Sequence, residues 1–370
     1  MADMVGLINL HEPEEKALAE LTGHRPLAAV PFGGRYRLID FALSNMVNSG
    51  IRNVGILFKQ KYRSLFDHLR SGKDWDLARK HGGLIMLPPS DHADDRGDLG
   101  NFFANLEFIR RSHEPYVAVS GTATVCNIDL REALAVHRAH SADLTIVYCE
   151  QPRPKDCADT TYELTIDADG RVKDVALATS SSGKRINIPL NMFILTKDVL
   201  IDLVTAGSAR GDYCFFHHGI IQKLPRLKAY AYRFLGHVAH ISGIASYLDH
   251  NLALLDPAIW HELFFASGAI HTKSKDEPPT KYINGALVRN SLVASGCLIA
   301  GRVESSVLFR NVKIGAGAAV SRSVIMQRCV IEPGAVLENV ICDKDVHITA
   351  GKLLKGEPCY PLVIKKGVTV

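Results

Sequence analysis

The sequence lacks the features that would place the chain in a membrane or outside the cell. No run of about 18 apolar residues occurs, and the N-terminus has no basic segment followed by an apolar one. The eight cysteines form no Cys-x-x-Cys pair and no metal-ligand spacing, which is typical of a reduced protein without disulfides. We therefore expect a soluble cytoplasmic chain with no membrane partner and no metal site.

A strong charge of one sign is also missing. The net charge is only +4, and charged residues make up 22% of the chain. The 16 histidines are scattered, and no basic stripe of the kind that nucleic acid requires is present. We expect no nucleic-acid partner. With 370 residues, of which 47% are hydrophobic, the chain is long enough for two domains with a core.

Glycine is absent from the first predicted strand-to-helix turn. The apolar residues 4–10 predict a strand, and residues 11–16 read HEPEEK. In α/β domains, phosphates usually bind at this turn, on glycine amides at a helix N-terminus. Carboxylates repel a triphosphate, and proline removes a backbone donor. Proline followed by two glutamates is instead a good start for a helix. The turn therefore predicts a plain helix and no nucleotide site.

What the sequence does contain, up to about residue 255, is an alternation of short apolar strands and amphipathic helices. The predicted strands are 4–10, 54–58, 116–120, 144–149, 163–166, 188–195 and 229–234, and the predicted helices include 37–49, 97–112 and 130–140. Strands separated by helices predict a mostly parallel sheet covered by helices, which is an α/β domain.

The pattern changes after residue 255. Residues 256–282 contain prolines and a charged stretch, and we interpret them as an interdomain connection. Beyond residue 283, aliphatic or small residues recur every six positions, namely Val312, Ala318, Val324, Val330 and Val336. A six-residue period favours a parallel β-helix over a β-sandwich, whose strands would alternate with a period of two. The predicted domains are thus 1–255 and 283–370.

One segment carries a family resemblance. Residues 32–51, FGGRYRLIDFALSNMVNSGI, closely resemble the signature of bacterial glucose-1-phosphate adenylyltransferases (ADP-glucose pyrophosphorylases). The resemblance extends over most of the chain. It implies a Rossmann-like nucleotidyltransferase domain of the GT-A type followed by a left-handed β-helix of hexapeptide repeats. In that family the β-helix mainly makes subunit contacts and transmits regulation.

The resemblance also shows which catalytic positions differ. An ungapped count places the family's phosphate-contacting arginine on Ala17 and its lysine on Leu27. The two aspartates that hold magnesium in the family fall on Thr122 and His240. Magnesium requires oxygen ligands, and imidazole prefers softer metals. We therefore expect no catalytic residues, with these four positions degenerate. Substitution of the lost cations by Lys16 or Arg25, and a zinc site at His237 and His240, are less favoured alternatives.

The positions that bind the sugar phosphate in the family are changed as well. The family's Glu-Lys-Pro aligns loosely with residues 178–180, its glucose-lining strand becomes residues 188–193, and its Asp-Phe-Gly-Lys-Asp becomes residues 214–218. Proline and asparagine replace a serine and a glycine in that strand, where a sugar must approach the backbone. Residues 98–101 also depart from the family pattern. Segments that carry the fold resemble the family, and segments that carry the chemistry do not.

A group of cations could still form an anion site. His24, Arg25, Arg35 and Arg37 cluster around the Phe-Gly-Gly turn, in a region that resembles the part of the family where sugar-phosphate effectors bind. Two interpretations stay open: an effector site, or surface ion pairs.

The resemblance implies a catalytically inactive regulatory subunit with a catalytic ADP-glucose pyrophosphorylase subunit as its partner, in a heterotetramer. Its surface would then act on the partner's conformational equilibrium. We expect no cofactor. The alternatives are an active sugar-phosphate nucleotidyltransferase with unusual site residues and a free-standing sugar-phosphate sensor.

Overall fold

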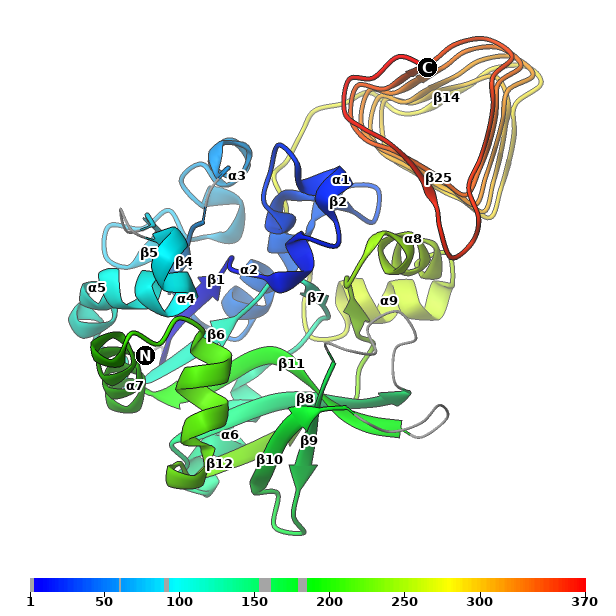
Figure 1. Cartoon of the computed structure of the whole chain (residues 1–370). Helices are drawn as coiled ribbons and strands as arrows, with labels where there is room; N and C mark the ends of the chain where they lie inside the picture. The colour runs from blue at the N-terminus through cyan, green and yellow to red at the C-terminus, as the bar shows by residue number, and fades with distance from the viewer. Residues whose placement is uncertain (1–2, 60, 90–92, 153–160, 179–184) are drawn as a thin grey trace. The chain divides into compact units, whose positions relative to one another are not determined.

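The computed structural model describes residues 3–59, 61–89, 93–152, 161–178 and 185–370. The chain forms two compact units (Figure 1). The first consists of Met1–Glu12, Phe41–Val238 and Phe265–His271, and the second of Pro13–Asp40, Ala239–Phe264 and Thr272–Val370. The units therefore do not follow the predicted limits at 255 and 282, because two segments of the first predicted domain belong to the unit that contains the β-helix. The division at 255 and 282 stays a proposal.

The first unit is built on a seven-stranded sheet in the order β12-β8-β11-β6-β1-β4-β5. Only β11 runs antiparallel to its neighbours, β6 and β8, so the prediction of a mostly parallel sheet is confirmed. The strands are β1 Met4–Asn9, β4 Asn53–Leu57, β5 Gly83–Leu87, β6 Tyr116–Ser120, β8 Leu144–Pro152, β11 Arg185–Thr196 and β12 Ala229–Arg233. Every residue of β1 is buried, as expected for a strand covered on both faces.

The helices of this unit follow the sequence pattern closely in two places. Helices α2 (Leu38–Asn48) and α6 (Leu130–Ala139) agree with prediction to within a residue at either end. The single helix predicted over 97–112 is instead two, α4 (Ala93–Ala104) and α5 (Leu106–Arg111), with Asn105 between them. Helices α3 (Arg63–Leu69) and α7 (Lys197–Arg210) were not among the predicted elements. Within the described residues, no helix is long and apolar enough to cross a membrane.

The turn after β1 does not continue into the plain helix that its sequence predicts. Pro13–Glu15 forms a single 3-10 turn, and α1 (Ala19–Thr22) has only four residues. The Thr22 hydroxyl donates to the carbonyls of both Glu15 and Leu18, which folds the two turns against each other. Gly23 ends α1, and Pro26 follows closely, so the helix cannot extend.

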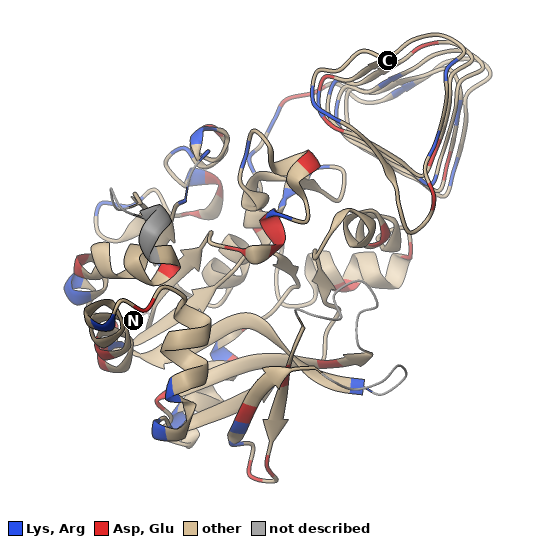
Figure 2. Cartoon of the chain, viewed as in Figure 1, with Lys and Arg blue, Asp and Glu red and all other residues tan. Residues whose placement is uncertain are grey.

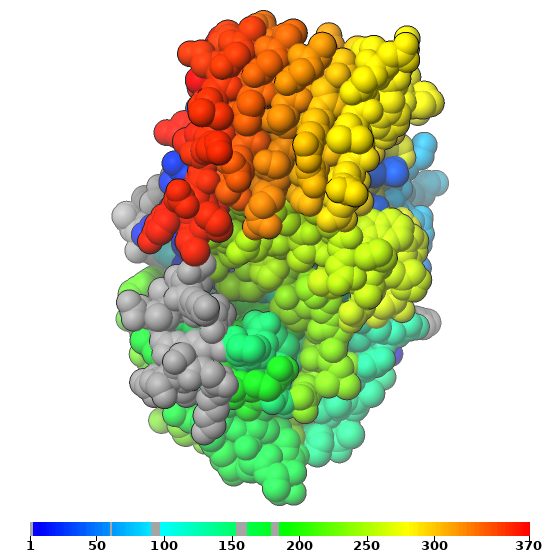
Figure 3. Space-filling model, turned by 90° about the vertical axis from the view of Figure 1, so that its right-hand side faces the viewer, coloured from blue at the N-terminus to red at the C-terminus, as the bar shows by residue number. Residues whose placement is uncertain are grey.

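The second unit contains the predicted β-helix, whose coils form a triangle in Figure 1 and stacked ridges in Figure 3. It has three parallel sheets of five strands. The first holds β14 Lys281–Tyr282, β17 Leu298–Ile299, β20 Lys313–Ile314, β23 Val330–Ile331 and β26 His347–Ile348. The second holds β15 Leu287–Arg289, β18 Arg302–Glu304, β21 Ala319–Ser321, β24 Val336–Glu338 and β27 Leu353–Lys355. The third holds β16 Leu292–Val293, β19 Val307–Leu308, β22 Val324–Ile325, β25 Val340–Cys342 and β28 Leu362–Ile364.

The predicted column of inward residues is only partly right. Val312 and Ala318 belong to the β-helix core, whereas Val330 and Val336 are half-exposed beside the buried Ile331 and Leu337. The reason is the length of a coil. The Ser306 hydroxyl accepts from the Ser323 amide, and the Ser323 hydroxyl accepts from the Val340 amide, each 17 residues further on. Between residues 306 and 340, a coil is therefore one residue shorter than three repeats of six, and a strict period of six loses the inward face.

Residues 31–37 show why the signature segment is a structural one. Strands β2 (Pro31–Phe32) and β3 (Tyr36–Arg37) flank a turn in which Gly33 and Gly34 have φ of 61° and 77°, which favours glycine. The Gly33 amide donates to Asn251 of α8 (Ile244–Ala253) at 3.0 Å. The Tyr36 ring stacks on Phe264 of α9 (Pro257–Phe265) with centroids 4.8 Å apart. Helix α9 lies within the segment predicted as a connection.

Candidate functional site

The turn after β1 holds a carboxylate that is bonded to the loop after β6. Glu12 is buried, and its Oε1 accepts from the backbone amides of Thr122 and Ala123, the latter at 2.6 Å. Its Oε2 accepts from the Thr122 hydroxyl at 2.5 Å. Two adjacent amides and a hydroxyl that point at one position form an oxyanion-binding concavity. The protein's own Glu12 occupies this concavity.

The part of β11 that the resemblance aligns with the family's glucose-lining strand is crowded beside the same loop. Asn191 in β11 has φ of 55°, at the position where the resemblance implies a glycine. A Cβ on Gly121 would lie only 2.7 Å from Asn191 Nδ2 and 2.8 Å from Glu12 Oε1. Asn191 and Glu12 therefore both crowd the backbone of Gly121. The space next to the loop after β6 is filled by side chains of the chain itself.

Thr122 is fully buried and supplies no carboxylate to a metal. His240 is half-buried, and its Nε2 lies 3.5 Å from Glu14 Oε1. Burial lowers the pKa of His240, and the Glu14 carboxylate opposes this shift without reversing it. The residues at these two positions do not fit magnesium, which prefers oxygen ligands. The described residues contain no group of three or more His, Cys, Asp or Glu side chains placed to hold a metal.

The other two positions that the resemblance predicts to be degenerate carry no cation. Leu27 is buried in a 3-10 turn, and Ala17 is an exposed residue. Lys16, which could have replaced a lost cation, is exposed, and Arg25 is committed to an ion pair described below.

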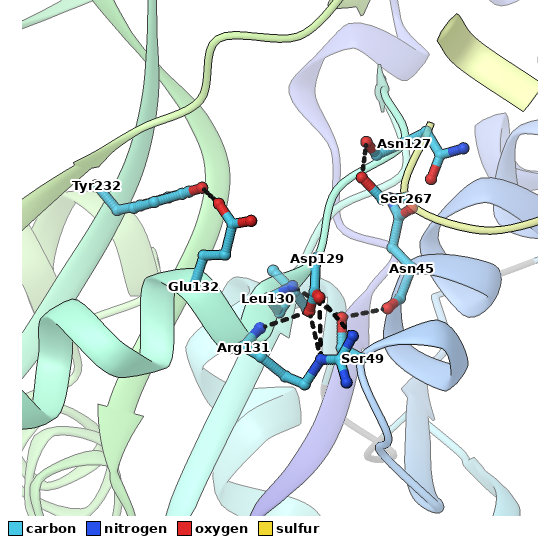
Figure 4. Close-up of polar contacts among 9 residues, drawn as sticks. All are labelled: Asn45, Ser49, Asn127, Asp129, Leu130, Arg131, Glu132, Tyr232 and Ser267. Atoms are coloured by element: carbon cyan, nitrogen blue, oxygen red, sulfur yellow. Dashed lines mark hydrogen bonds and ion pairs between the residues drawn. The ribbon is translucent and has the colours of Figure 1, made fainter. Parts of the chain in front are cut away.

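Asp129 is the next carboxylate along the chain after Thr122, and it has a structural role. It is the N-cap of α6 and accepts from the Arg131 amide at 2.9 Å, while the Arg131 guanidinium binds both its oxygens (Figure 4). Burial raises the pKa of Asp129, but the bonds from Arg131 outweigh it and the net shift is downward. The hydroxyl of Ser49, the residue after α2, accepts from the Leu130 amide and so fixes the start of α6. Asp129 is therefore used as a helix cap.

Two polar side chains of α4, Asp98 and Asn101, bond to groups elsewhere in the first unit. Asn9 Nδ2 donates to Asp98 Oδ2 at 3.0 Å, and the Phe215 amide donates to Asp98 Oδ1 at 2.8 Å. Burial raises the pKa of Asp98, and these bonds oppose the shift. Asn101 Nδ2 donates to the Phe58 carbonyl at 2.7 Å. These groups are satisfied within the protein.

The segment aligned with the family's Asp-Phe-Gly-Lys-Asp is a π-helical turn, Phe215–Ile220. The Cys214 sulfur accepts from the His217 amide, and His218 Nδ1 accepts from the Cys214 amide. Phe215 is buried in the core of the first unit, where it stacks on Phe102. Of residues 178–180, which the resemblance aligns with Glu-Lys-Pro, only Ala178 lies within the described residues, and it is buried.

A cavity in the second unit is built around Arg25. Its volume is about 250 Å³, and it is lined by Ala19, Glu20, Leu21, Gly23, His24, Arg25, Asp343, Lys365 and Lys366. Arg25 is 5% exposed and Asp343 3% exposed, and they form an ion pair of 2.7 Å. Arg25 Nε is buried and has no hydrogen-bond partner within the described chain. A buried donor without a partner beside a cation-lined cavity is what an oxyanion site provides.

Further cations of the second unit lie close enough to interact with one another or with Arg25, and Figure 2 shows Lys and Arg at corners of the stacked coils. We call the following set the basic cluster: Arg25, Arg35, Arg37, Lys275, Arg310, Arg328, Lys344, Lys365 and Lys366. Burial lowers the pKa of Lys275, and Arg310, Arg328 and Arg37 lower it further. Burial likewise lowers the pKa of Arg310, and nearby Arg35 adds to the shift. A bound anion would relieve the repulsion among the cations of the basic cluster, so the cluster favours anion binding.

Only two of the four predicted cations line the cavity. His24 and Arg25 line the cavity together. Arg37 lies near Lys344 and Lys275, and the exposed Arg35 lies near Arg310. The sequence reasoning missed the cations of the β-helix, which are far away in the chain. The run Asp343-Lys344-Asp345 and the pair Lys365-Lys366 are the sequence signals that could have pointed to some of them.

A mostly parallel α/β unit together with a β-helix of hexapeptide-like coils defines a nucleotidyltransferase-type protein with a C-terminal hexapeptide domain. Two family models match the chain accordingly. The model described as "Nucleotidyl transferase" matches residues 16–158, and that described as "GlmU-like, C-terminal hexapeptide" matches residues 278–356.

Curated relatives match almost the whole chain. The glycogen biosynthesis protein GlgD of Bacillus subtilis is 37% identical over 99% of this chain and 96% of the relative. The protein of the same name from Geobacillus stearothermophilus is 40% identical over 98% of this chain and 96% of the relative. The glucose-1-phosphate adenylyltransferase of Thermomicrobium roseum is 34% identical over 96% of this chain and 84% of the relative. The chain belongs to the glucose-1-phosphate adenylyltransferase family and, within it, to the GlgD type.

Proposed function

We propose that this chain is a catalytically inactive regulatory subunit in glycogen biosynthesis, which binds a catalytic glucose-1-phosphate adenylyltransferase subunit and raises its activity. The observation that carries the proposal is the Glu12 carboxylate, which fills the oxyanion position formed by Thr122 and Ala123. Nucleotidyl transfer requires charge stabilisation at the triphosphate. A site filled by the protein's own carboxylate presents a negative charge instead, which does not stabilise a triphosphate. The names of the relatives support the role in glycogen biosynthesis.

The proposal includes an effector, a partner and a place in the cell. The basic cluster favours an anionic effector, such as a sugar phosphate, near His24, Arg25, Arg35 and Arg37. A heterotetramer with the catalytic subunit, in the cytoplasm, is the assembly that we infer. An active nucleotidyltransferase with unusual residues is less well supported, because no cation stands at the degenerate positions 17 and 27.

The isolated chain is expected to make no measurable ADP-glucose from ATP and glucose 1-phosphate with magnesium, and Thr122→Asp is not expected to change this. Each lost electrostatic contact lowers the rate by about 100–1,000-fold. Thr122→Asp would also replace the hydroxyl that donates to Glu12 by a second carboxylate. Pyrophosphate release is the measurement, with a catalytic relative assayed in parallel as the positive control. Turnover by partner-free protein, or by Thr122→Asp alone, would show that the site is not disabled.

When this chain is added, a catalytic subunit from the same cell is expected to become more active. Its affinity for effector or substrate should rise by about 5–150-fold, the usual range of allosteric coupling. Stabilisation of the partner's competent conformation is the physical reason. Size-exclusion chromatography of the co-expressed chains, followed by kinetics, is the measurement. If the two chains elute separately at micromolar concentration and the kinetics do not change, the free-standing sensor becomes the better account.

A further inference from the structure

Helix α3 (Figure 1) has an exposed face that combines aromatic rings and cations. The Phe66 amide donates to the Tyr62 carbonyl at 3.1 Å, and the Arg70 amide donates to the Phe66 carbonyl at 2.9 Å. Residues at this spacing of four lie above one another on one side of a helix. The opposite side is buried and carries Leu65, His68 and Leu69. We call Tyr62, Arg63, Phe66 and Arg70, which are all exposed, the α3 surface.

The two aromatic rings of the α3 surface are exposed but held in place. Tyr62 is 45% exposed and Phe66 is 40% exposed. Their ring centroids lie 5.3 Å apart with an interplanar angle of 71°. The buried Phe58 ring stacks on the Phe66 ring, with centroids 5.1 Å apart and an angle of 9°. Because the rings are already fixed, covering them with another apolar side chain costs little conformational entropy.

The segment around α3 carries an excess of positive charge. Residues 59–81 contain seven Lys or Arg and three Asp, a net charge of +4, which equals the net charge of the whole chain. Arg79 pairs with Asp76, and Asp67 also interacts within the protein. In the described part of the chain, the exposed cations of this segment that make no ion pair include Arg63, Arg70, Lys73 and Lys80. Electrostatic complementarity therefore selects an acidic partner.

We propose that the α3 surface is a docking site for an acidic segment of another protein, which carries one large apolar side chain. The apolar side chain packs against the Tyr62 and Phe66 rings, and carboxylates beside it pair with Arg63 and Arg70. Aromatic residues and arginine contribute much of the binding energy at protein interfaces. The proposal adds an interaction surface to the proposed function and holds whether or not the chain activates a catalytic subunit.

A single-stranded nucleic acid is the less favoured occupant. Bases can also stack on exposed aromatic rings, and phosphates can pair with cations. In residues 59–81, however, three aspartates lie between the cations. A continuous phosphate backbone would meet these carboxylates, whereas a short acidic peptide segment can place its charges between them.

The probe is a short synthetic peptide with one central phenylalanine among glutamates and alanines, labelled with a fluorophore. We expect the full chain to bind it saturably, with a dissociation constant below about 100 μM by fluorescence anisotropy. Replacing the phenylalanine of the peptide by alanine, or its glutamates by glutamine, should weaken binding by about tenfold or more. Added salt should also weaken binding, because it screens exposed charges.

Phe66→Ala removes one of the two rings, and the double change Arg63→Glu with Arg70→Glu reverses the charge. Each variant should bind the peptide about tenfold or more weakly than wild type. Phe103→Ala is the matched control, because Phe103 of α4 is 41% exposed, nearly the same as Phe66. It should leave binding unchanged. Equal binding by wild type and Phe66→Ala would overturn the proposal, and so would equal weakening by Phe103→Ala.

Measurements on the wild-type chain cover the case in which the variants do not fold. A peptide with benzoylphenylalanine in place of phenylalanine should crosslink to residues 61–70, as mapped by mass spectrometry. Crosslinks found only elsewhere, or no binding of the peptide, would overturn the proposal. Single-stranded RNA bound as tightly as the peptide would overturn it too. These readouts need no catalytic subunit, so failure to activate one would contradict the proposed function and leave the docking site standing.

Discussion

Asp343→Ala is expected to lower the free energy of unfolding by about 3–5 kcal/mol. Among the described residues, the substitution removes the one carboxylate paired with a buried guanidinium, since Arg25 and Asp343 are 5% and 3% exposed and pair at 2.7 Å. Arg25 would then be a buried cation facing Lys344. Urea denaturation followed by far-UV circular dichroism is the measurement.

Asp345→Ala is the matched control. Asp345 lies two residues further on and also pairs with an arginine, Arg328, but these side chains are 36% and 53% exposed. Exposed pairs contribute about 0–1 kcal/mol, so the loss should be small. The double change Arg25→Met with Asp343→Leu should recover much of the stability, because it leaves no uncompensated charge. Equal losses for Asp343→Ala and Asp345→Ala would contradict the assignment of Arg25 as a buried cation.

Glu12→Ala is expected to lower the free energy of unfolding by about 2–5 kcal/mol, because each buried donor left without an acceptor costs about 1–3 kcal/mol. The donors are the Thr122 and Ala123 amides, both bound by Glu12 Oε1. Glu12→Gln is the control, since its amide oxygen can accept from both and its nitrogen can donate to the Thr122 hydroxyl. Its cost should be about 1 kcal/mol. Thermal and urea unfolding would measure both, and similar losses would show that these hydrogen bonds contribute little.

The elements that the sequence predicts correctly are those whose signal is local. Strands and helices of the first unit follow from their apolar periodicity, and α2 and α6 agree within a residue. The β-helix follows from its repeat, but the 17-residue coil does not, because a few valines cannot distinguish 17 residues from 18. The turn after β1 was predicted as a helix from its Pro-Glu-Glu start. The sequence cannot show that Thr22 folds it back.

From the sequence we could predict which catalytic groups would be missing from the site. We could not predict which side chains of the site contact one another. The resemblance predicts from position that Thr122 and His240 stand where the family has aspartates. That Glu12 bonds to Thr122 cannot be predicted in this way, because 110 residues separate them. Arg25 and Asp343 are 318 residues apart, so an arginine in a basic turn gave no sign of a buried pair. Nothing in the sequence distinguishes Lys344 from a surface lysine, because only the fold brings it near Arg37, Arg25 and Arg328.

The bond between Glu12 and the loop after β6 has an evolutionary consequence. A change to an acid at position 122 would first bring two carboxylates together, while loss of Glu12 would first leave two buried amides without acceptors. Either order passes through a less stable chain, and marginal stability makes such intermediates costly to fitness. Because Glu12 and Thr122 depend on each other in this way, a lineage can change the surface of this protein far more readily than it can change either of these two residues alone.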